Sequence, residues 1–157
     1  MPHPHADIRP RAARLSALRA PILCAGLLSL PLAATPVMAQ DTTNFGLELN
    51  NARAAGEGCR LTYVANNNTG TDLETTSYEV AVFDQEGVVS RLLILEFGEL
   101  RDGKTKVVQF DLADMGCEEI SRLLLNSVSE CTAEGGAEAD CLDGLVTSSR
   151  ADIQFGI

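Results

Sequence analysis

The amino-acid sequence predicts an all-β protein: an immunoglobulin-like antiparallel β-sandwich of about seven strands that follows an N-terminal signal peptide. Three observations support this prediction. Beyond the first 39 residues, short runs alternate apolar and polar side chains, segments rich in Gly, Asn and Asp separate these runs, and no long stretch repeats the helical period. About seven strands in roughly 118 residues match the size of one sandwich domain.

The first 39 residues have the pattern of a secretory signal peptide. Arginines make residues 9–19 basic, an apolar stretch follows over 22–34, and residues 37–39 supply the small-residue pattern of a cleavage site. We therefore expect residues 1–39 to be removed and residues 40–157 to form one domain in the periplasm. An uncleaved membrane anchor is the alternative, but a spanning helix needs roughly 20 apolar residues and this stretch is shorter.

The first three expected strands lie between residues 45 and 83. Residues 45–49 alternate apolar with polar or small side chains and predict a half-buried strand, whereas the small, polar segment 52–58 predicts a loop. The alternation returns in 59–66, which predicts a second strand. A turn follows at 66–70, because Asn and Gly tolerate positive φ. Its Asn-Asn-Thr sequence is formally a glycosylation acceptor, which we interpret as turn chemistry. The third strand is expected over 74–83.

The fourth expected strand, 88–97, is unusual because it is apolar on both faces through residues 92–95. Such a strand is typical of the centre of a sheet, or of a face that another segment covers. A tight hairpin at 84–87 precedes it. A helix over 118–125 is the alternative to the sixth strand, since two glutamates favour a helix N-terminus. The later strands are expected at 106–112, 120–128 and 145–155.

The central hairpins carry a pattern of their own. An aromatic residue and Asp end one strand, a Gly hairpin follows, and a Gly-containing turn precedes a strand with an inward Phe. The matching residues are Phe83-Asp84, Gly87, Asp102-Gly103-Lys104 and Phe110. This stretch resembles the FxLYD-like group of small bacterial β-sandwich domains. The whole chain also resembles a family of uncharacterised exported alphaproteobacterial proteins, with an FGLELNNA-like start and an SSRADIQF-like last strand. Neither resemblance implies catalytic residues.

Four cysteines follow the signal peptide, and their even number predicts disulfides in an oxidising compartment. Four cysteines allow three pairings. We favour Cys131–Cys141, which closes over a small polar segment, together with Cys59–Cys117, which ties the start of one strand to the loop before another. A zinc or redox site is the alternative, but residues 40–157 contain no C-x-x-C pair and no His to support one.

The charge of residues 40–157 restricts the function. Their 21 acidic and 8 basic side chains give a net charge of −13 without a visible basic patch, so we expect no binding to nucleic acid or to an anionic membrane surface. This part of the chain has no His, and Lys104 and Lys106 are expected on a solvated strand face. Because nothing then activates a nucleophile, we expect no enzymatic activity and no cofactor.

Acidic side chains gather around two of the expected loops. Asp111, Asp114, Glu118 and Glu119 surround one loop and are weak candidates for a calcium site, since calcium prefers about six to eight oxygen ligands. The sequence has no EF-hand spacing, so we interpret both loops mainly as solvated, acidic surface.

The sequence therefore predicts a non-enzymatic periplasmic interaction or accessory module with an unknown protein partner. One row of the fourth strand must face the core, which leaves the other row as an apolar interaction face. The exposed row is either Val88, Leu92 and Ile94, which is our candidate, or else Val89, Leu93 and Leu95. A homodimer through this face is one alternative, and a small-ligand or calcium-binding periplasmic domain is the other.

Overall fold

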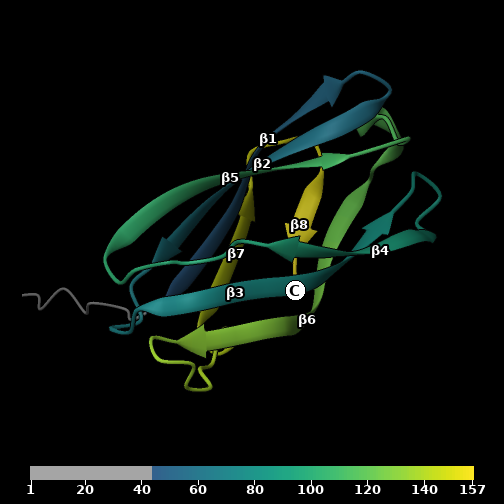
Figure 1. The fold of residues 1–157 in the computed structure, drawn as a ribbon. Coiled ribbons are helices and arrows are strands. Elements are labelled where there is room, and N and C mark those ends of the chain that lie inside the picture. The colour runs from purple at the N-terminus through teal and green to yellow at the C-terminus, as the bar shows by residue number, and fades with distance from the viewer. Residues whose placement is uncertain (1–43) are drawn as a thin grey trace, which may run out of the picture. The chain divides into compact units, whose positions relative to one another are not determined.

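Two four-stranded β-sheets pack as a sandwich in the computed structural model, which describes residues 44–157 (Figure 1). The strands are β1 Phe45–Ala55, β2 Gly58–Asn67, β3 Leu73–Phe83, β4 Val89–Glu96, β5 Lys104–Leu112, β6 Arg122–Ala133, β7 Leu145–Ser149 and β8 Gln154–Gly156, with a 3-10 helix, η1, at Cys117–Glu119. The first sheet has the order β5-β2-β1-β7 and the second the order β4-β3-β6-β8. The predicted all-β sandwich is confirmed. The predicted signal peptide, residues 1–39, lies outside the described residues.

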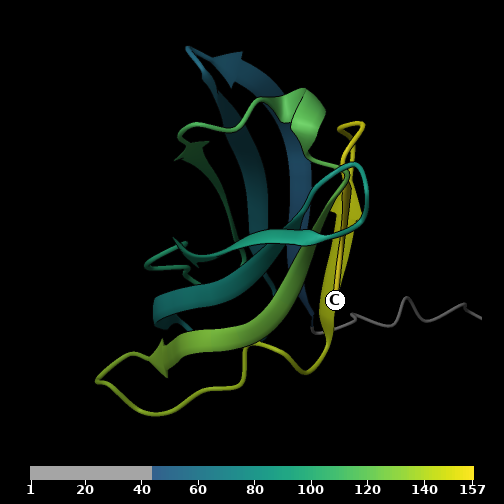
Figure 2. The ribbon, with the colours of Figure 1, turned by 90° about the vertical axis from the view of Figure 1, so that its right-hand side faces the viewer.

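Most strand pairs are antiparallel, but the C-terminal segment is not. The single strand expected at 145–155 is wrong in this detail: β7 pairs in parallel with β1, and β8 pairs in parallel with β6 in the other sheet. The hydroxyl of Ser149 donates to the carbonyl of Ile153 at 2.6 Å, and this local side-chain bond favours a turn over a continued strand. Figure 2 shows β7 and β8, in yellow, running along one side of the sandwich.

The β1–β2 hairpin is longer than the sequence indicates. The two strands pair from Phe45 opposite Asn67 to Ala55 opposite Gly58, so the loop expected at 52–58 is wrong. Small residues in that segment have little strand propensity of their own, and the ladder with β2 overrides it. The turn needs Gly56, whose φ is +64°.

β6 settles the helix alternative in favour of the predicted strand. Leu123 and Leu125 are two positions apart and both buried, which is the period of a strand. Within residues 44–157 helical geometry is confined to η1, so a helix over 118–125 is wrong. Among residues 44–157, no helix is long and apolar enough to cross a membrane.

The core between the sheets is centred on aromatic rings. Tyr63 on β2 is fully buried and meets the rings of Phe97, Phe110 and Phe155 edge-to-face, with ring centroids 5.2–5.9 Å apart. Such pairs favour one arrangement of the rings, because ring edges and faces carry opposite partial charge. The Tyr63 hydroxyl has no hydrogen-bond partner within the described part of the chain.

Two disulfides are present, and they have the favoured pairing. Cys59–Cys117 joins β2 to η1 with Cα atoms 4.8 Å apart. Cys131–Cys141 closes the loop after β6 with Cα atoms 6.0 Å apart. Disulfides form and persist in oxidising compartments, so the pair indicates an extracytoplasmic location.

A buried asparagine organises the turn after β2. Asn67 is fully buried, and its Nδ2 donates to the carbonyls of Thr71 and Leu100, both at 2.8 Å. Its Oδ1 accepts from the backbone N–H of Thr69 at 3.0 Å and from the Thr69 hydroxyl at 2.8 Å. The glycosylation acceptor is therefore closed to modification in the folded protein, and the prediction of turn chemistry at this site agrees with the geometry.

Candidate functional site

β4 is an edge strand with an open outer face. The expectation of a central or covered strand is wrong, because a run of apolar residues determines neither the position of a strand in its sheet nor the exposure of its outer face. Leu95 is 4% exposed and points to the core, whereas Leu92 and Ile94 are 56% and 50% exposed. Val88 and Val89 are exposed too, because the register with β3 shifts at this end and breaks the alternation. The candidate row of Val88, Leu92 and Ile94 therefore lies at the surface.

The backbone of β4 also faces outward at this edge. The N–H of Phe97, just after the strand, donates to the carbonyl of Thr76 in β3 at 2.8 Å. In an antiparallel pair, every second residue bonds to the partner strand, so Leu95 and Leu93 direct their backbone groups towards β3. Leu92 and Ile94 then direct their N–H and C=O groups to the free edge. The side chains exposed on the outer face and the unpaired backbone groups thus belong to the same residues.

The apolar row continues from β4 across the second sheet. Ala81 on β3 lies in register between Leu92 on β4 and Leu124 on β6, and it is only 4% exposed. Carboxylates stand beside this row: Glu79 is opposite Ile94, and exposed Glu96 ends the strand. The outer face near β4 is therefore an apolar strip with an acidic border.

Two cationic side chains cross the side of the sandwich between the edge strands β4 and β5. Arg91 donates to the carbonyl of Ala113 at 3.0 Å, and the ammonium of Lys106 donates to the carbonyls of Phe97 and Glu99 at 2.7 and 3.1 Å. Lys104 and Lys106 are both exposed, as expected, and the ammonium of Lys106 is in addition held by these two carbonyls.

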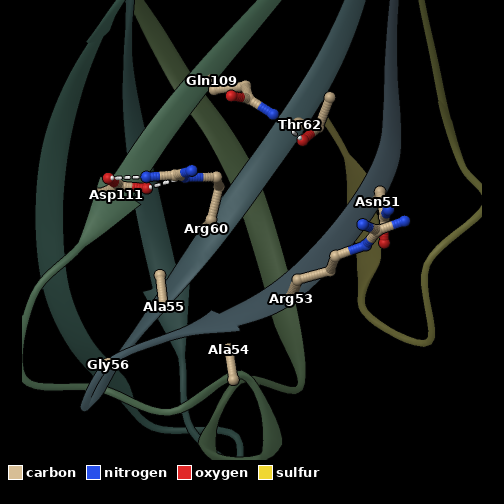
Figure 3. A pocket seen from close by; sticks show the side chains of 9 residues that line it. All are labelled: Asn51, Arg53, Ala54, Ala55, Gly56, Arg60, Thr62, Gln109 and Asp111. Carbon is tan, nitrogen blue, oxygen red and sulfur yellow. Dashed lines mark hydrogen bonds and ion pairs between the residues drawn. The ribbon is translucent and has the colours of Figure 1, made fainter.

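A second surface feature is a polar hollow on the outer face of the first sheet (Figure 3), with a volume of about 620 Å³. Arg60 on β2 forms a two-bond ion pair with Asp111 on β5, at 2.6 and 2.7 Å. This hydrogen bonding from Arg60 lowers the pKa of the Asp111 carboxyl. The next row joins Gln109 to Thr62 by a 3.1 Å hydrogen bond. The hollow is lined by Asn51, Arg53, Ala54, Ala55, Gly56, Arg60, Thr62, Gln109 and Asp111.

This hollow was not predicted from the sequence. Its residues come from three strands, and only the cross-strand register places them together. The sequence signal that could have indicated it is that Arg53 and Arg60, two of the 8 basic residues in 40–157, lie close together near the start of the domain.

The four calcium candidates do not form a site. Asp111 is engaged by Arg60, and Glu119 accepts the backbone N–H of Gly116 at 2.6 Å. Over residues 44–157, no group of three or more His, Cys, Asp or Glu side chains is placed to hold a metal ion. The four candidates, Asp111, Asp114, Glu118 and Glu119, therefore share a stretch of sequence without meeting as a cluster in residues 44–157.

Comparisons with known proteins give a fold and no family. No protein-family model matches the chain, and no curated protein is similar to it in sequence. A solved structure of IrmA from Escherichia coli is similar in fold, with a TM-score of 0.51 and 12% sequence identity. The similarity covers 66% of this chain and 90% of the IrmA chain. At this identity the comparison supports the sandwich architecture alone.

Proposed function

We propose that the protein is a non-enzymatic periplasmic interaction module that binds an extended segment of a partner protein along β4. The observation that supports this most directly is the coincidence, at Leu92 and Ile94, of exposed apolar side chains with backbone groups directed to a free edge. Adding a strand to such an edge is a recurring way to bind peptides: main-chain hydrogen bonds supply affinity, and alternate side chains supply specificity.

The edge is only partly protected against such pairing. Natural edge strands are commonly blocked by bulges, prolines or lysines. In β4 the irregularity is confined to its start, where the register shifts and the hydroxyl of Ser90 donates to the carbonyl of Val82 at 3.1 Å. The rest of the strand, 91–96, pairs regularly with β3 and contains no lysine or proline. We therefore assign the partner segment to this regular part.

Charge defines the chemistry of the partner. Glu79 and Glu96 border the apolar strip, and residues 40–157 carry a net charge of −13. A segment whose outward-facing row combines apolar side chains with a basic residue would place the apolar ones beside Leu92 and Ile94 and the basic one beside Glu96, because side chains two positions apart share a face of the sheet. The overall negative field would also speed the encounter with a basic partner.

Location and class rest on separate support. The signal-peptide pattern of residues 1–39 and the two disulfides favour export to the periplasm. The absence of histidine from residues 40–157 favours a non-catalytic role. The resemblance to FxLYD-like domains and to exported alphaproteobacterial proteins is consistent with a small exported sandwich.

A proline substitution at the edge tests the proposal. Ile94→Pro removes an N–H that faces the free edge, so it should block an added strand while the ladder to β3 stays intact. A photo-crosslinking residue at Leu92 would capture the partner from a periplasmic extract of the producing cell, and mass spectrometry would map the crosslinked segment. We expect a segment whose outward-facing row is apolar with a basic residue near one end, and we expect Ile94→Pro to abolish the crosslink.

The matched control lies on the opposite sheet. Val107 on β5 is 62% exposed and belongs to the other edge strand, so a crosslinker there should capture nothing that Ile94→Pro removes. The proposal is wrong if the crosslinked segment is acidic or helical. A crosslink to a second copy of this chain, together with a dimer in sedimentation that Ile94→Pro dissociates, would instead make β4 a self-association edge.

A further inference from the structure

We propose that the hollow on the first sheet binds a hydroxylated carboxylic acid, of the size and kind of a sugar acid, with its carboxylate beside Arg53 and Arg60. This site lies on the sheet opposite to β4 and does not depend on the partner-binding proposal. It rests on the placement of two arginines, on the neutral polar groups beside them and on the net charge of the hollow.

The two arginines occupy positions that stability alone disfavours. Arg53 on β1 is directly opposite Arg60 on β2, and like charges at such positions repel. Placing two arginines opposite each other is notable because residues 40–157 contain only 8 basic side chains. An anion bound between the two guanidinium groups would turn this repulsion into attraction, which gives the arrangement a functional reason.

Only one of the two arginines is neutralised. Arg60 is held by Asp111, whereas Arg53 forms no hydrogen bond or ion pair with any residue in the described range 44–157. Figure 3 shows the two side chains turned apart, Arg60 towards Asp111 and Arg53 towards Asn51. The hollow therefore carries two positive charges and one negative charge, and this balance suits a monoanion such as a carboxylate better than a phosphate dianion.

The ion pair with Asp111 orients the guanidinium of Arg60 and leaves some of its N–H donors free for a ligand. Asp111 accepts from Nε and Nη2 of Arg60, which leaves the Nη1 donors and the second Nη2 donor for another acceptor. Because Asp111 fixes the plane of this guanidinium, little side-chain freedom remains to be lost on binding. Arg53 brings a free planar fork, the geometry that matches a carboxylate with two parallel hydrogen bonds.

The neighbouring row favours hydroxyl groups on the ligand. Asn51, Thr62 and Gln109 lie side by side in the cross-strand register and offer neutral donors and acceptors. The nine lining residues include no aromatic ring, so a neutral sugar has no surface on which to stack. A volume of about 620 Å³ falls in the range of about 300–1,000 Å³ that ligand sites occupy. The carboxylate must therefore supply the main anchor, and the hydroxyls the orientation.

Titration by NMR with sodium glucuronate tests the inference, with glucose and inorganic phosphate as the comparison ligands. We expect glucuronate to shift the amide signals of the β1–β2 hairpin at millimolar concentration, glucose to shift none, and phosphate to bind more weakly than glucuronate. Arg53→Gln should weaken glucuronate binding at least about tenfold, since it removes a charge-assisted pair of hydrogen bonds.

Two controls separate binding from folding. Arg150→Gln breaks the 2.8 Å pair with Glu48 on the same sheet, outside the lining of the hollow, and should leave glucuronate binding unchanged. Arg53→Gln itself should not lower the melting temperature, because it relieves the repulsion with Arg60. The inference is overturned if glucuronate produces no shift, if phosphate binds more tightly than glucuronate, or if Arg53→Gln binds as the unaltered protein does.

Discussion

Replacing Asn67 should destabilise the protein more than any change at the neighbouring asparagines. The side chain makes four hydrogen bonds, and each intramolecular bond contributes about 1 kcal/mol net. The carbonyl of Leu100 would keep its bond from the backbone N–H of Leu73 at 3.0 Å, so part of the loss is spared. We therefore expect Asn67→Ala to lower the free energy of unfolding by about 3 kcal/mol, or the melting temperature by roughly 10–15 °C.

The isosteric change Asn67→Asp tests the geometry more sharply. It keeps the acceptor for Thr69 but sets a carboxylate oxygen against the carbonyls of Thr71 and Leu100. Burial and these carbonyls would raise the pKa of the new carboxyl in the folded state above its unfolded value. The penalty is then fully present at neutral pH and decreases as the pH falls through the folded-state pKa, because protonation restores a donor.

Urea unfolding at pH 7 and at pH 4 measures both effects. Asn68→Ala is the matched control, since Asn68 is exposed and its loss should change stability by no more than about 0.5 kcal/mol. If Asn67→Ala costs no more than Asn68→Ala, the buried network does not hold the turn. If Asn67→Asp shows no gain in relative stability at low pH, the side chain of residue 67 does not donate to these two carbonyls.

Three further predictions use the same unfolding assay. Replacing both cysteines of the β2–η1 disulfide by alanine should lower the free energy of unfolding by about 4 kcal/mol, and replacing both in the loop after β6 by about 3 kcal/mol. The first value is larger because that disulfide closes a loop of 58 residues and the second a loop of 10. The reverse order would contradict the chain-entropy reasoning. Tyr78→Phe should lower the free energy of unfolding by about 1 kcal/mol, because it loses the 2.7 Å hydrogen bond to the carbonyl of residue 141. Tyr63→Phe removes a buried hydroxyl that has no partner in residues 44–157, so it should be neutral or stabilising. Equal losses would show that Tyr63 has a partner. Leu95→Ala should cost about 3 kcal/mol and Leu92→Ala less than about 0.5 kcal/mol, and similar values for the two would mean that the outer row is also buried.

Local patterns in the sequence were sufficient for much of the fold. Alternation such as that of Leu61, Tyr63 and Ala65 marks a strand with one buried face, and these three residues are fully buried. The disulfide pairing was predictable because the segment between Cys131 and Cys141 is small and polar and has little to bury. Glycine marked the turns that need positive φ at every position in residues 44–157 except Asp114.

Features that depend on sheet position were not predictable in the same way. The two apolar faces of β4 fit equally well in the middle of a sheet and at its edge, since composition reports neither the exposure of a side chain nor the neighbours of a strand. The arginine pair is invisible in the sequence because Arg53 and Arg60 meet only through the hairpin register. The last strand is divided into β7 and β8 because the Ser149 hydroxyl donates to the nearby carbonyl of Ile153 and favours a turn. The alternation of apolar and polar residues does not decide between such a turn and a continued strand.

The parallel pairing of β7 with β1 has a consequence for the order in which the protein can fold. Phe45 is opposite Leu145 across this pair, so strands a hundred residues apart in the chain must meet before the first sheet is complete. Contacts between such distant segments form slowly, because a long loop must close before they contribute any stability. A chain that emerges from its N-terminal end therefore cannot finish the first sheet until β7 has emerged, and until then one side of β1 stays open.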